Sequence, residues 1–435
     1  MLRRIILKNF RIVDADTDFF GSLIIENNVI KKIVADTENI PDADITIDGS
    51  VFDSSTVLMP AFVDLHAHFR DPGFPEKETL ESASLAAVAG GFTTVVCMAN
   101  TNPVTDTIEK ARVLKARSDA LGFIDLYPVL SLTKNMEGRE LSGIKDLPAA
   151  EVLMLSEDGK DVANDNLFLA AMGEAKRLGI PVSCHCDFGG TEADAAKKAG
   201  RPRAEWSRIE ENNAVRRAIE LGKKTGCHIH IAHVSTKEAA EIIREAKKNS
   251  VSDNGFFLTC EATPHHIGAT EEDARRMGDE SFGRVNPPLR SEADRQAIIA
   301  AINDGTIDAI ATDHAPHSEA DKAAGSPGFS GLETAFAVCL SHLTHEMTPN
   351  QELQRLSALM SKNPARIIGL RDRGGITAGL RADLVIVDTQ ARQKVNPAQL
   401  KSRGKCSPFA GKELRGKILM TLNAGKIVYM GETSA

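Results

Sequence analysis

The chain has 435 residues, of which 42% are hydrophobic and 26% are charged. This balance is ordinary for a globular protein and excludes a disordered, collagen-like or fibrous chain. The formal net charge of −8 and the aromatic content of 5% argue against nucleic-acid binding, because a phosphate backbone needs a basic surface and single strands need aromatic platforms.

Both ends of the chain are rich in short apolar runs and predict β structure. The expected strands are residues 5–13, 22–25, 29–34, 382–387, 418–422 and 426–430. Two of the gaps between them carry turn signals, Glu26-Asn27-Asn28 and Asn423-Ala424-Gly425, which predict hairpins. We therefore expect one small β domain built from both termini.

Between residues 58 and 370, short apolar strands alternate with longer helical segments. The expected strands are residues 59–64, 93–98, 123–128, 152–155, 181–185, 228–233, 256–261 and 309–312. The expected helices include residues 80–89, 165–178, 210–225 and 237–248. Eight strands with intervening helices predict a (β/α)8 barrel. The predicted class is α/β, a TIM barrel at 58–370 with a β domain formed by 1–57 and 371–435.

The sequence predicts a cytoplasmic protein without a membrane segment. Residues 82–105 carry no charge, but Gly90-Gly91 and a polar tail interrupt them, so a buried helix followed by a buried strand is expected. The apolar run that begins at Ile5 ends at Lys8, which is too short for a signal peptide. Seven scattered cysteines without a CxxC motif are typical of a reducing compartment.

Polar side chains recur where the predicted barrel strands end. His66 and His68 end the first strand, and their spacing of two residues places both imidazoles on one side of it. The other such residues are Asp158, His185, His233 and Asp313, at the ends of the fourth, fifth, sixth and eighth strands. Because the C-terminal strand ends form the face that carries the active site, these residues predict a metal centre. Nitrogen and oxygen ligands favour zinc, with Mn, Co or Fe as alternatives, and six ligands suit two ions sharing a carboxylate.

The remaining histidines of these strands are expected outside the ligand set. His228 and His230 have the opposite strand parity to His233, so we expect them to face the helices. His265 and His266 either orient ligands from behind or serve in packing.

Five motifs together resemble the dihydroorotases of the amidohydrolase superfamily. They are VDLHAHFRDPGF, VVCMANTNP, HVST, RVNPPLR and DAIATDHAPH, in this order within residues 55–370. The resemblance implies reversible closure of N-carbamoyl-L-aspartate to L-dihydroorotate, the third step of pyrimidine synthesis. It also implies a site of one or two zinc ions at the barrel mouth, in which the longer bacterial form uses Asp as bridging ligand in place of a carbamylated Lys.

The resemblance also implies roles for individual residues. The implied metal ligands are His66, His68, Asp158, His185, His233 and Asp313. The implied substrate contacts are Arg70, Asn100, Asn286 and His317. Glu157 and Lys160 are rivals of Asp158 for the bridging position. We expect Asp313 to act as the catalytic acid and base, because a carboxylate there can move a proton between the attacking hydroxide and the leaving nitrogen.

Several other functions are compatible with the same pattern. Hydantoinase, dihydropyrimidinase and allantoinase share the barrel and the HxH pair, but Arg70 and Asn100 favour a substrate with a free carboxylate, which the guanidinium fork fits. A non-catalytic scaffold for aspartate transcarbamoylase could dispense with metal ligands, whereas this chain has a suitable residue at every ligand position. The expected partners are a small-molecule substrate and a second copy in a homodimer, with aspartate transcarbamoylase as a further candidate.

Overall fold

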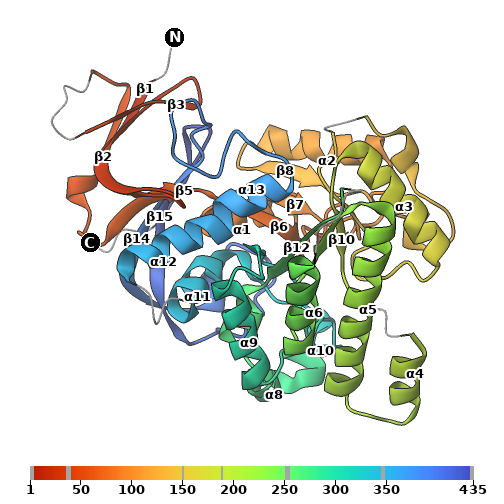
Figure 1. Cartoon of the computed structure of the whole chain (residues 1–435). Helices are drawn as coiled ribbons and strands as arrows, with labels where there is room; N and C mark the ends of the chain where they lie inside the picture. Colours follow the sequence, from red (N-terminus) through yellow and green to blue (C-terminus); the bar gives the residue numbers. More distant parts are fainter. Residues whose placement is uncertain are drawn as a thin grey trace.

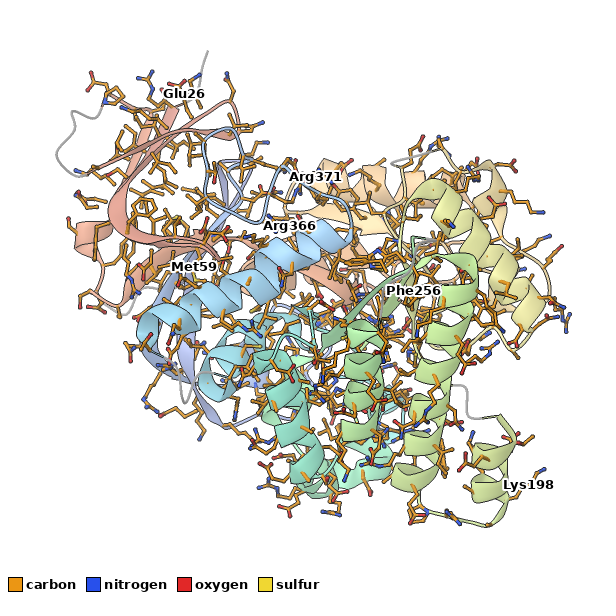
Figure 2. All side chains as sticks on the ribbon, in the orientation of Figure 1. Glu26, Met59, Lys198, Phe256, Arg366 and Arg371 are labelled. Carbon is orange, nitrogen blue, oxygen red and sulfur yellow. The ribbon has the colours of Figure 1, made fainter. Side chains whose placement is uncertain are left out.

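Figure 1 shows the computed structural model of the chain, in which a barrel of parallel strands lies beside a separate β sheet. The structure describes residues 4–35, 41–148, 151–187, 190–249, 255–343 and 348–431. Strands from the two ends of the chain, drawn in red and in blue, lie side by side in the sheet, and the green helices lie together over the barrel. In Figure 2, Glu26 marks the outer end of the sheet and Lys198 lies at the far end of the molecule.

Eight parallel strands form a closed barrel. They are β6 (Phe62–Ala67), β7 (Phe92–Cys97), β8 (Asp125–Pro128), β9 (Leu155–Ser156), β10 (Val182–Cys184), β11 (His228–Ile231), β12 (Phe257–Ala262) and β13 (Ala309–Ile310). They pair as two groups, β6-β7-β8 and β9-β10-β11-β12-β13. Single bridges close the ring at both gaps, Leu130 with Leu155 and Ala67 with His314. The predicted barrel is therefore confirmed, and the C-terminal ends of its strands share one face.

The helices surround the barrel strands. They are α1 (Leu80–Ala89), α2 (Ile108–Leu121), α3 (Asp165–Leu178), α4 (Gly190–Lys198), α5 (Arg203–Thr225), α6 (Lys237–Lys248), α7 (Pro264–Gly268), α8 (Glu271–Met277), α9 (Glu292–Asn303), α10 (Glu319–Ala323), α11 (Ala335–His342), α12 (Pro349–Ser357) and α13 (Asn363–Ile367). The helices α1, α3 and α6 begin and end at the predicted residues, each after a side chain that caps its first turn, namely Thr79, Asn164 and Thr236. None of the described helices is both long and apolar enough to span a membrane.

Helix α5 is longer than the sequence predicts. It begins at Arg203, whereas the apolar pattern predicts a start at residue 210. Of its first seven residues only Ser207 is buried. The first two turns therefore lack the apolar residues at spacings of three and four by which a helix is recognised in a sequence.

A second sheet joins both ends of the chain. Its strands are β1 (Arg4–Val13), β2 (Asp18–Glu26), β3 (Val29–Val34), β4 (Ile45–Asp48), β5 (Thr56–Pro60), β14 (Leu384–Lys394), β15 (Glu413–Asn423) and β16 (Lys426–Met430). The order is β16-β15-β14-β5-β1-β2-β3, with β4 paired to β1, so β5 and β14 link the two termini. Leu7 and Phe10 from one end pack with Leu384 and Leu422 from the other in a common core. The predicted β domain from both termini is confirmed.

The first predicted barrel strand, residues 59–64, is wrong as a single element. Met59 belongs to β5 and pairs with Val385 in the β domain, whereas the barrel strand β6 begins at Phe62. Both strands are buried, so one uninterrupted apolar run hides the change of sheet. We keep the division of the chain at 57/58 and 370/371 as a proposal, and β5 lies across its first boundary.

Candidate metal centre

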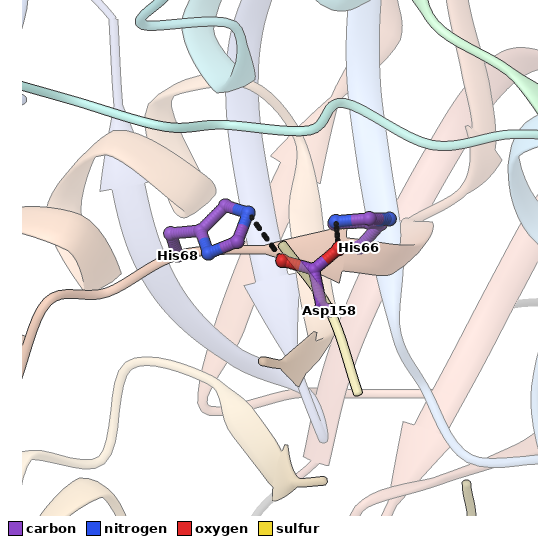
Figure 3. A group of neighbouring side chains, drawn as sticks. All are labelled: His66, His68 and Asp158. Carbon is purple, nitrogen blue, oxygen red and sulfur yellow. Dashed lines mark ion pairs between the residues drawn. The ribbon is translucent and has the colours of Figure 1, made fainter. Parts of the chain in front are cut away.

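His66 and His68 lie at the end of β6 and face the carboxylate of Asp158, which presents one oxygen to each ring (Figure 3). The Nε2 atom of His66 lies 3.1 Å from Oδ1 of Asp158, and Nε2 of His68 lies 3.4 Å from Oδ2. All three side chains are buried, and one possible ligand atom from each lies within 4.8 Å of the others. The HxH spacing thus brings two imidazoles to one carboxylate.

Asp158 also belongs to a second group of ligand-type side chains. Its Oδ1 atom lies 3.1 Å from Nδ1 of His185, which lies 2.9 Å from Nε2 of His233. Ligand atoms of these three residues also lie within 4.8 Å of one another. Because Asp158 faces both groups, it stands where a carboxylate shared by two cations would stand.

Asp313 completes the set of six predicted ligands. Its Oδ1 atom lies 3.2 Å from Nε2 of His68 and 3.6 Å from Nε2 of His66. The backbone φ angle is +44° at Asp313 and +34° at His233, a region that non-glycine residues rarely adopt. Such local strain persists where the surrounding fold imposes it, and it gathers at functional sites.

The two rivals of Asp158 for the bridging position point elsewhere. The Glu157 carboxylate accepts hydrogen bonds from the backbone N–H groups of Leu132 and Thr133, at 2.9 and 3.0 Å, and from the Thr133 hydroxyl. The Lys160 ammonium donates to the carbonyl oxygen of Met136 at 2.9 Å. Of the three candidates, Asp158 is the one that contacts the histidines.

The charges of the cluster fit a bound cation. Burial by itself raises the pKa of Asp158, but the charges of His66 and His68 outweigh it and lower that pKa well below its ordinary value. Burial also raises the pKa of Asp313, but the contact with His68 and the charges of both histidines outweigh it and lower that pKa. Among the described residues, none forms a hydrogen bond with the buried Nε2 atom of His66. A divalent ion would ligate that nitrogen and neutralise both carboxylates, so these residues suit the predicted metal.

The far nitrogens of the HxH pair each contact a buried polar side chain. Nδ1 of His66 lies 3.2 Å from Oε1 of Glu261, and Nδ1 of His68 lies 2.9 Å from Oδ1 of Asn100. Glu261 is absent from the sequence-based prediction. An acid in the apolar strand FLTCEA is the signal that could have revealed it, because a fully buried glutamate requires partners.

The expectation that His230 faces the helices is wrong. Its side chain is fully buried and its Nε2 atom lies 3.0 Å from Glu261, the residue that holds His66. The parity argument fails because β11 ends at Ile231 and the backbone turns at His233, where φ is positive. Alternation counted back from His233 therefore assigns His230 to the wrong face of the strand.

Arg70 and His317 lie together beside the cluster. Nε of Arg70 donates to the carbonyl oxygen of Pro316 at 3.2 Å, and Nη2 lies 3.2 Å from Nε2 of His317. Loss of hydration lowers the pKa of this half-buried guanidinium, and the charges of Asp313 and Asp158 only partly oppose that effect. Its Nη1 nitrogen makes no hydrogen bond to any described residue and is free to bind an anion.

The two predicted asparagine contacts have different surroundings. Asn100 is engaged inside the cluster, since its amide nitrogen lies 3.1 Å from Oδ2 of Asp158 while its oxygen faces His68. Asn286 is exposed and accepts a hydrogen bond from the Arg203 guanidinium. It lines a cavity of about 200 Å³ that reaches His185. The structure therefore places Asn286 at the mouth of the site and Asn100 behind His68.

A family model and individual relatives place this chain in the same family. The model of the amidohydrolase family matches residues 57–428. A dihydroorotase from Clostridium botulinum is 41% identical over 426 residues, which cover 98% of this chain and 99% of that protein. A dihydroorotase from Clostridium acetobutylicum is 37% identical, with 98% and 99% covered.

Solved structures with a similar fold carry other names. An L-hydantoinase (dihydropyrimidinase) from Arthrobacter aurescens has a TM-score of 0.85 and 27% identity, covering 100% of this chain and 98% of its own. A D-hydantoinase (dihydropyrimidinase) from Thermus sp. has a TM-score of 0.81 and 22% identity, with 99% and 97% covered. At 22% identity the second likeness concerns the fold alone.

Proposed function

The chain belongs to the amidohydrolase family and, within it, to the dihydroorotases, and we propose that it interconverts N-carbamoyl-L-aspartate and L-dihydroorotate with the aid of zinc. It is an enzyme that acts on a cyclic amide. The observation that carries the proposal is the pairing of a cation-binding cluster with Arg70, a half-buried guanidinium that keeps one nitrogen free. A metal site alone serves any cyclic amide, whereas the arginine selects a ring that bears a carboxylate.

We propose that six side chains hold two zinc ions. His66 and His68 would hold one ion, His185 and His233 the other, and Asp158 would bridge them. Asp313 would complete the set beside the HxH pair. Such ions supply Lewis acidity, which lowers the pKa of water towards neutrality and polarises an amide carbonyl.

Arg70 would bind the carboxylate of the substrate. The contact of Nε with the Pro316 carbonyl and that of Nη2 with His317 hold the guanidinium in place, so the free Nη1 can meet a carboxylate with little loss of side-chain freedom. Asn286, at the mouth of the site, is a further donor for oxygens of the ring. The carboxylate is thereby held at a fixed distance from the cluster, which orients the amide bond for attack.

Asp313 would move the proton in both directions. In hydrolysis the ionised carboxylate takes a proton from the attacking water and delivers it to the ring nitrogen as the carbon–nitrogen bond breaks. In ring closure the ureido nitrogen bonds to the carboxyl carbon as a carbon–oxygen bond breaks. The oxygen leaves as water with two protons, one released by that nitrogen and one supplied by the protonated form of Asp313. Its lowered pKa keeps it ionised and ready to act as the base.

We propose further that the enzyme works in the cytoplasm as a homodimer, with aspartate transcarbamoylase as a candidate partner. The state of the cysteines supports the compartment, because all seven are free thiols and six are buried. The main alternative function is a hydrolase of neutral rings, suggested by the names of structural neighbours. Identity to the first of these is 27%, against 41% to a dihydroorotase.

A substrate panel tests the proposal. Purified enzyme loaded with zinc should be assayed with L-dihydroorotate, hydantoin, dihydrouracil and allantoin at equal concentrations. We expect the highest kcat/KM for L-dihydroorotate, because it alone among these rings carries a carboxylate for Arg70. A higher kcat/KM for any neutral ring would refute the assignment.

A further inference from the structure

A chain of polar side chains, buried except for the half-buried His228 at its end, runs through the barrel behind the candidate metal centre. Oε1 of Glu261 lies 3.2 Å from Nδ1 of His66, and Oε2 lies 3.0 Å from Nε2 of His230. Nδ1 of His230 lies 2.9 Å from the hydroxyl oxygen of Thr259, which lies 2.8 Å from Nε2 of His228. The contacts therefore connect the first barrel strand to both β11 and β12.

The pairing of β11 with β12 builds this chain of contacts. The two strands are parallel neighbours, with His230 opposite Thr259 in the register. Residues two apart on a strand share a face, so His228 and His230 on β11 meet Thr259 and Glu261 on β12. The side chains of Glu261 and His230 are fully buried, so neither can exchange these partners for water.

With neutral imidazole rings, the contacts permit one consistent placement of hydrogens. A carboxylate can only accept, so Nδ1 of His66 and Nε2 of His230 must each donate to Glu261. Nδ1 of His230 is then a bare acceptor for the Thr259 hydroxyl hydrogen, and the oxygen of Thr259 accepts from His228. Every polar atom along the chain is satisfied, and Nε2 of His66 is left with a free lone pair.

We propose that Glu261 is a positioning residue that fixes His66 as its Nδ1–H tautomer and aims Nε2 at the metal centre, and that His230 and Thr259 fix Glu261 in turn. Nε2 of His66 is the atom that lies 3.1 Å from Asp158 and lacks a hydrogen bond within the described part of the chain. A carboxylate behind a ligating imidazole also increases its basicity, which strengthens metal binding. The inference rests on the metal site of the proposed function and not on the identity of the substrate.

Glu261→Gln is the direct test. Glutamine keeps an oxygen for His66 but turns an NH₂ group towards His230, whose Nε2 already carries a hydrogen, so two donors meet. We expect zinc affinity, measured by competition with a chromophoric chelator, to fall about 10–100-fold. In the zinc-loaded protein, nitrogen-15 and proton NMR should show a hydrogen on Nδ1 of His66, and its proton resonance should move upfield in the variant, because a neutral amide oxygen is a weaker acceptor than a carboxylate.

Two further variants complete the experiment. Glu333→Gln is the matched control, because Glu333 accepts hydrogen bonds from the backbone of Lys401 and Ser402 and contacts no ligand; its zinc affinity should equal that of the wild type. Thr259→Val removes the far hydroxyl but keeps the carboxylate, and should weaken zinc binding by a smaller factor.

Wild-type zinc affinity in Glu261→Gln, together with an unchanged Nδ1–H resonance of His66, would overturn the proposal. Should Glu261→Gln fail to fold, wild-type zinc affinity in Thr259→Val would overturn it instead. The readouts involve no substrate. An enzyme that binds zinc as expected but leaves L-dihydroorotate intact would refute the proposed function and leave the role of Glu261 standing.

Discussion

Two adjacent acids, Glu157 and Asp158, have opposite surroundings. Glu157 is held by backbone N–H groups of the loop after β8, whereas Asp158 faces His66, His68 and His185. Both are buried, so burial does not distinguish them. The two acids differ in the groups that they contact. Replacing each carboxylate by its amide should therefore have different effects on zinc binding.

We expect Asp158→Asn to reduce zinc content and turnover strongly, because the shared ligand loses its charge. Glu157→Gln should retain zinc and lose stability, since its carboxylate accepts from the backbone of Leu132 and Thr133 and from the Thr133 hydroxyl and contacts none of the histidines. Zinc per chain, measured on both purified variants by atomic absorption, compares the two acids directly. Full zinc in Asp158→Asn would contradict the role of Asp158, and loss of zinc in Glu157→Gln alone would identify Glu157 as the ligand.

Arg70→Met should lower kcat/KM for L-dihydroorotate roughly 10²–10³-fold, because a charge-assisted contact in a dry site is lost. Arg70→Lys should have a kcat/KM between those of Arg70→Met and the wild type, since lysine keeps the charge but lacks the planar fork. Dihydrouracil, the same ring without the carboxylate, is the matched control substrate, and its kcat/KM should change little. Wild-type kcat/KM for L-dihydroorotate, or loss of zinc, would show that Arg70 is not the carboxylate anchor.

Asp313→Asn should lower kcat at least 10²-fold, the range that general acid–base catalysis contributes. In the wild type, hydrolysis needs the ionised carboxylate and should be favoured towards alkaline pH. Ring closure needs the protonated form and should be favoured towards acid pH. Rates measured in both directions across the same pH range check this, and identical profiles would count against Asp313 as the proton carrier.

The sequence predicts the six clustered residues because each stands at a strand end, and a barrel collects strand ends on one face. It could not predict the link from Glu261 through His230. That link depends on which face of β11 is inward, and the positive φ at His233 breaks the alternation on which such a prediction relies. Local backbone geometry of this kind leaves no periodic trace in a sequence.

At the scale of elements, a buried ion pair ties the loop after β11 to the segment before α9. Glu211 on α5 accepts hydrogen bonds from the backbone of Ser235 and Thr236, at 2.8 and 3.0 Å, and from Arg290 at 3.0 Å. Ser235 follows His233 by two residues. The position of the helix thus determines the course of the loop that carries a candidate ligand.

Arg290→Met should lower the free energy of unfolding by about 3–5 kcal/mol, because Glu211 would keep a buried charge without its partner. Arg392→Met is the matched control, since the ion pair of Arg392 with Glu413 is largely exposed and such pairs contribute about 0–1 kcal/mol. Urea denaturation followed by circular dichroism measures both. If both variants lost an equally small amount of unfolding free energy, the ion pair of Glu211 with Arg290 would not hold the loop.

At the scale of the whole molecule, the C-terminal part of the chain reaches the substrate side of the barrel. Ser402 and the backbone of Arg403 donate to the buried Glu78, and Gly404 packs against Pro316 and His317. A Cβ atom at Gly404 would lie 2.6 Å from Cβ of Pro316 and 2.9 Å from the backbone nitrogen of His317. The segment between β14 and β15 therefore helps to position His317.

We expect Gly404→Ala to raise KM for L-dihydroorotate several-fold, because the added methyl group displaces His317, the neighbour of Arg70. Zinc affinity should not change, since none of the metal ligands is touched. Gly173→Ala, on a helix where an added Cβ meets nothing within 4 Å, is the control and should keep the wild-type KM. An unchanged KM in Gly404→Ala would separate the C-terminal segment from substrate binding.

The sequence predicts the architecture at this scale because apolar runs and turn residues indicate the eight barrel strands and the two β-rich ends. It does not predict where the β domain stops. β5 and β6 are separated by Ala61 alone, and both are buried and apolar. Only the pairing partners, Val385 for one strand and Phe92 for the other, distinguish the two sheets, and pairing is a property of the folded chain.

The central claim is that this barrel hydrolyses L-dihydroorotate through the metal cluster at its mouth. The most direct measurement is turnover of L-dihydroorotate by metal-stripped enzyme during titration with zinc. We predict negligible turnover without zinc and a rise to a plateau as the cluster fills, with the same titration leaving Asp158→Asn inactive. Full turnover by the metal-stripped enzyme, or no turnover of L-dihydroorotate at saturating zinc, would contradict the claim.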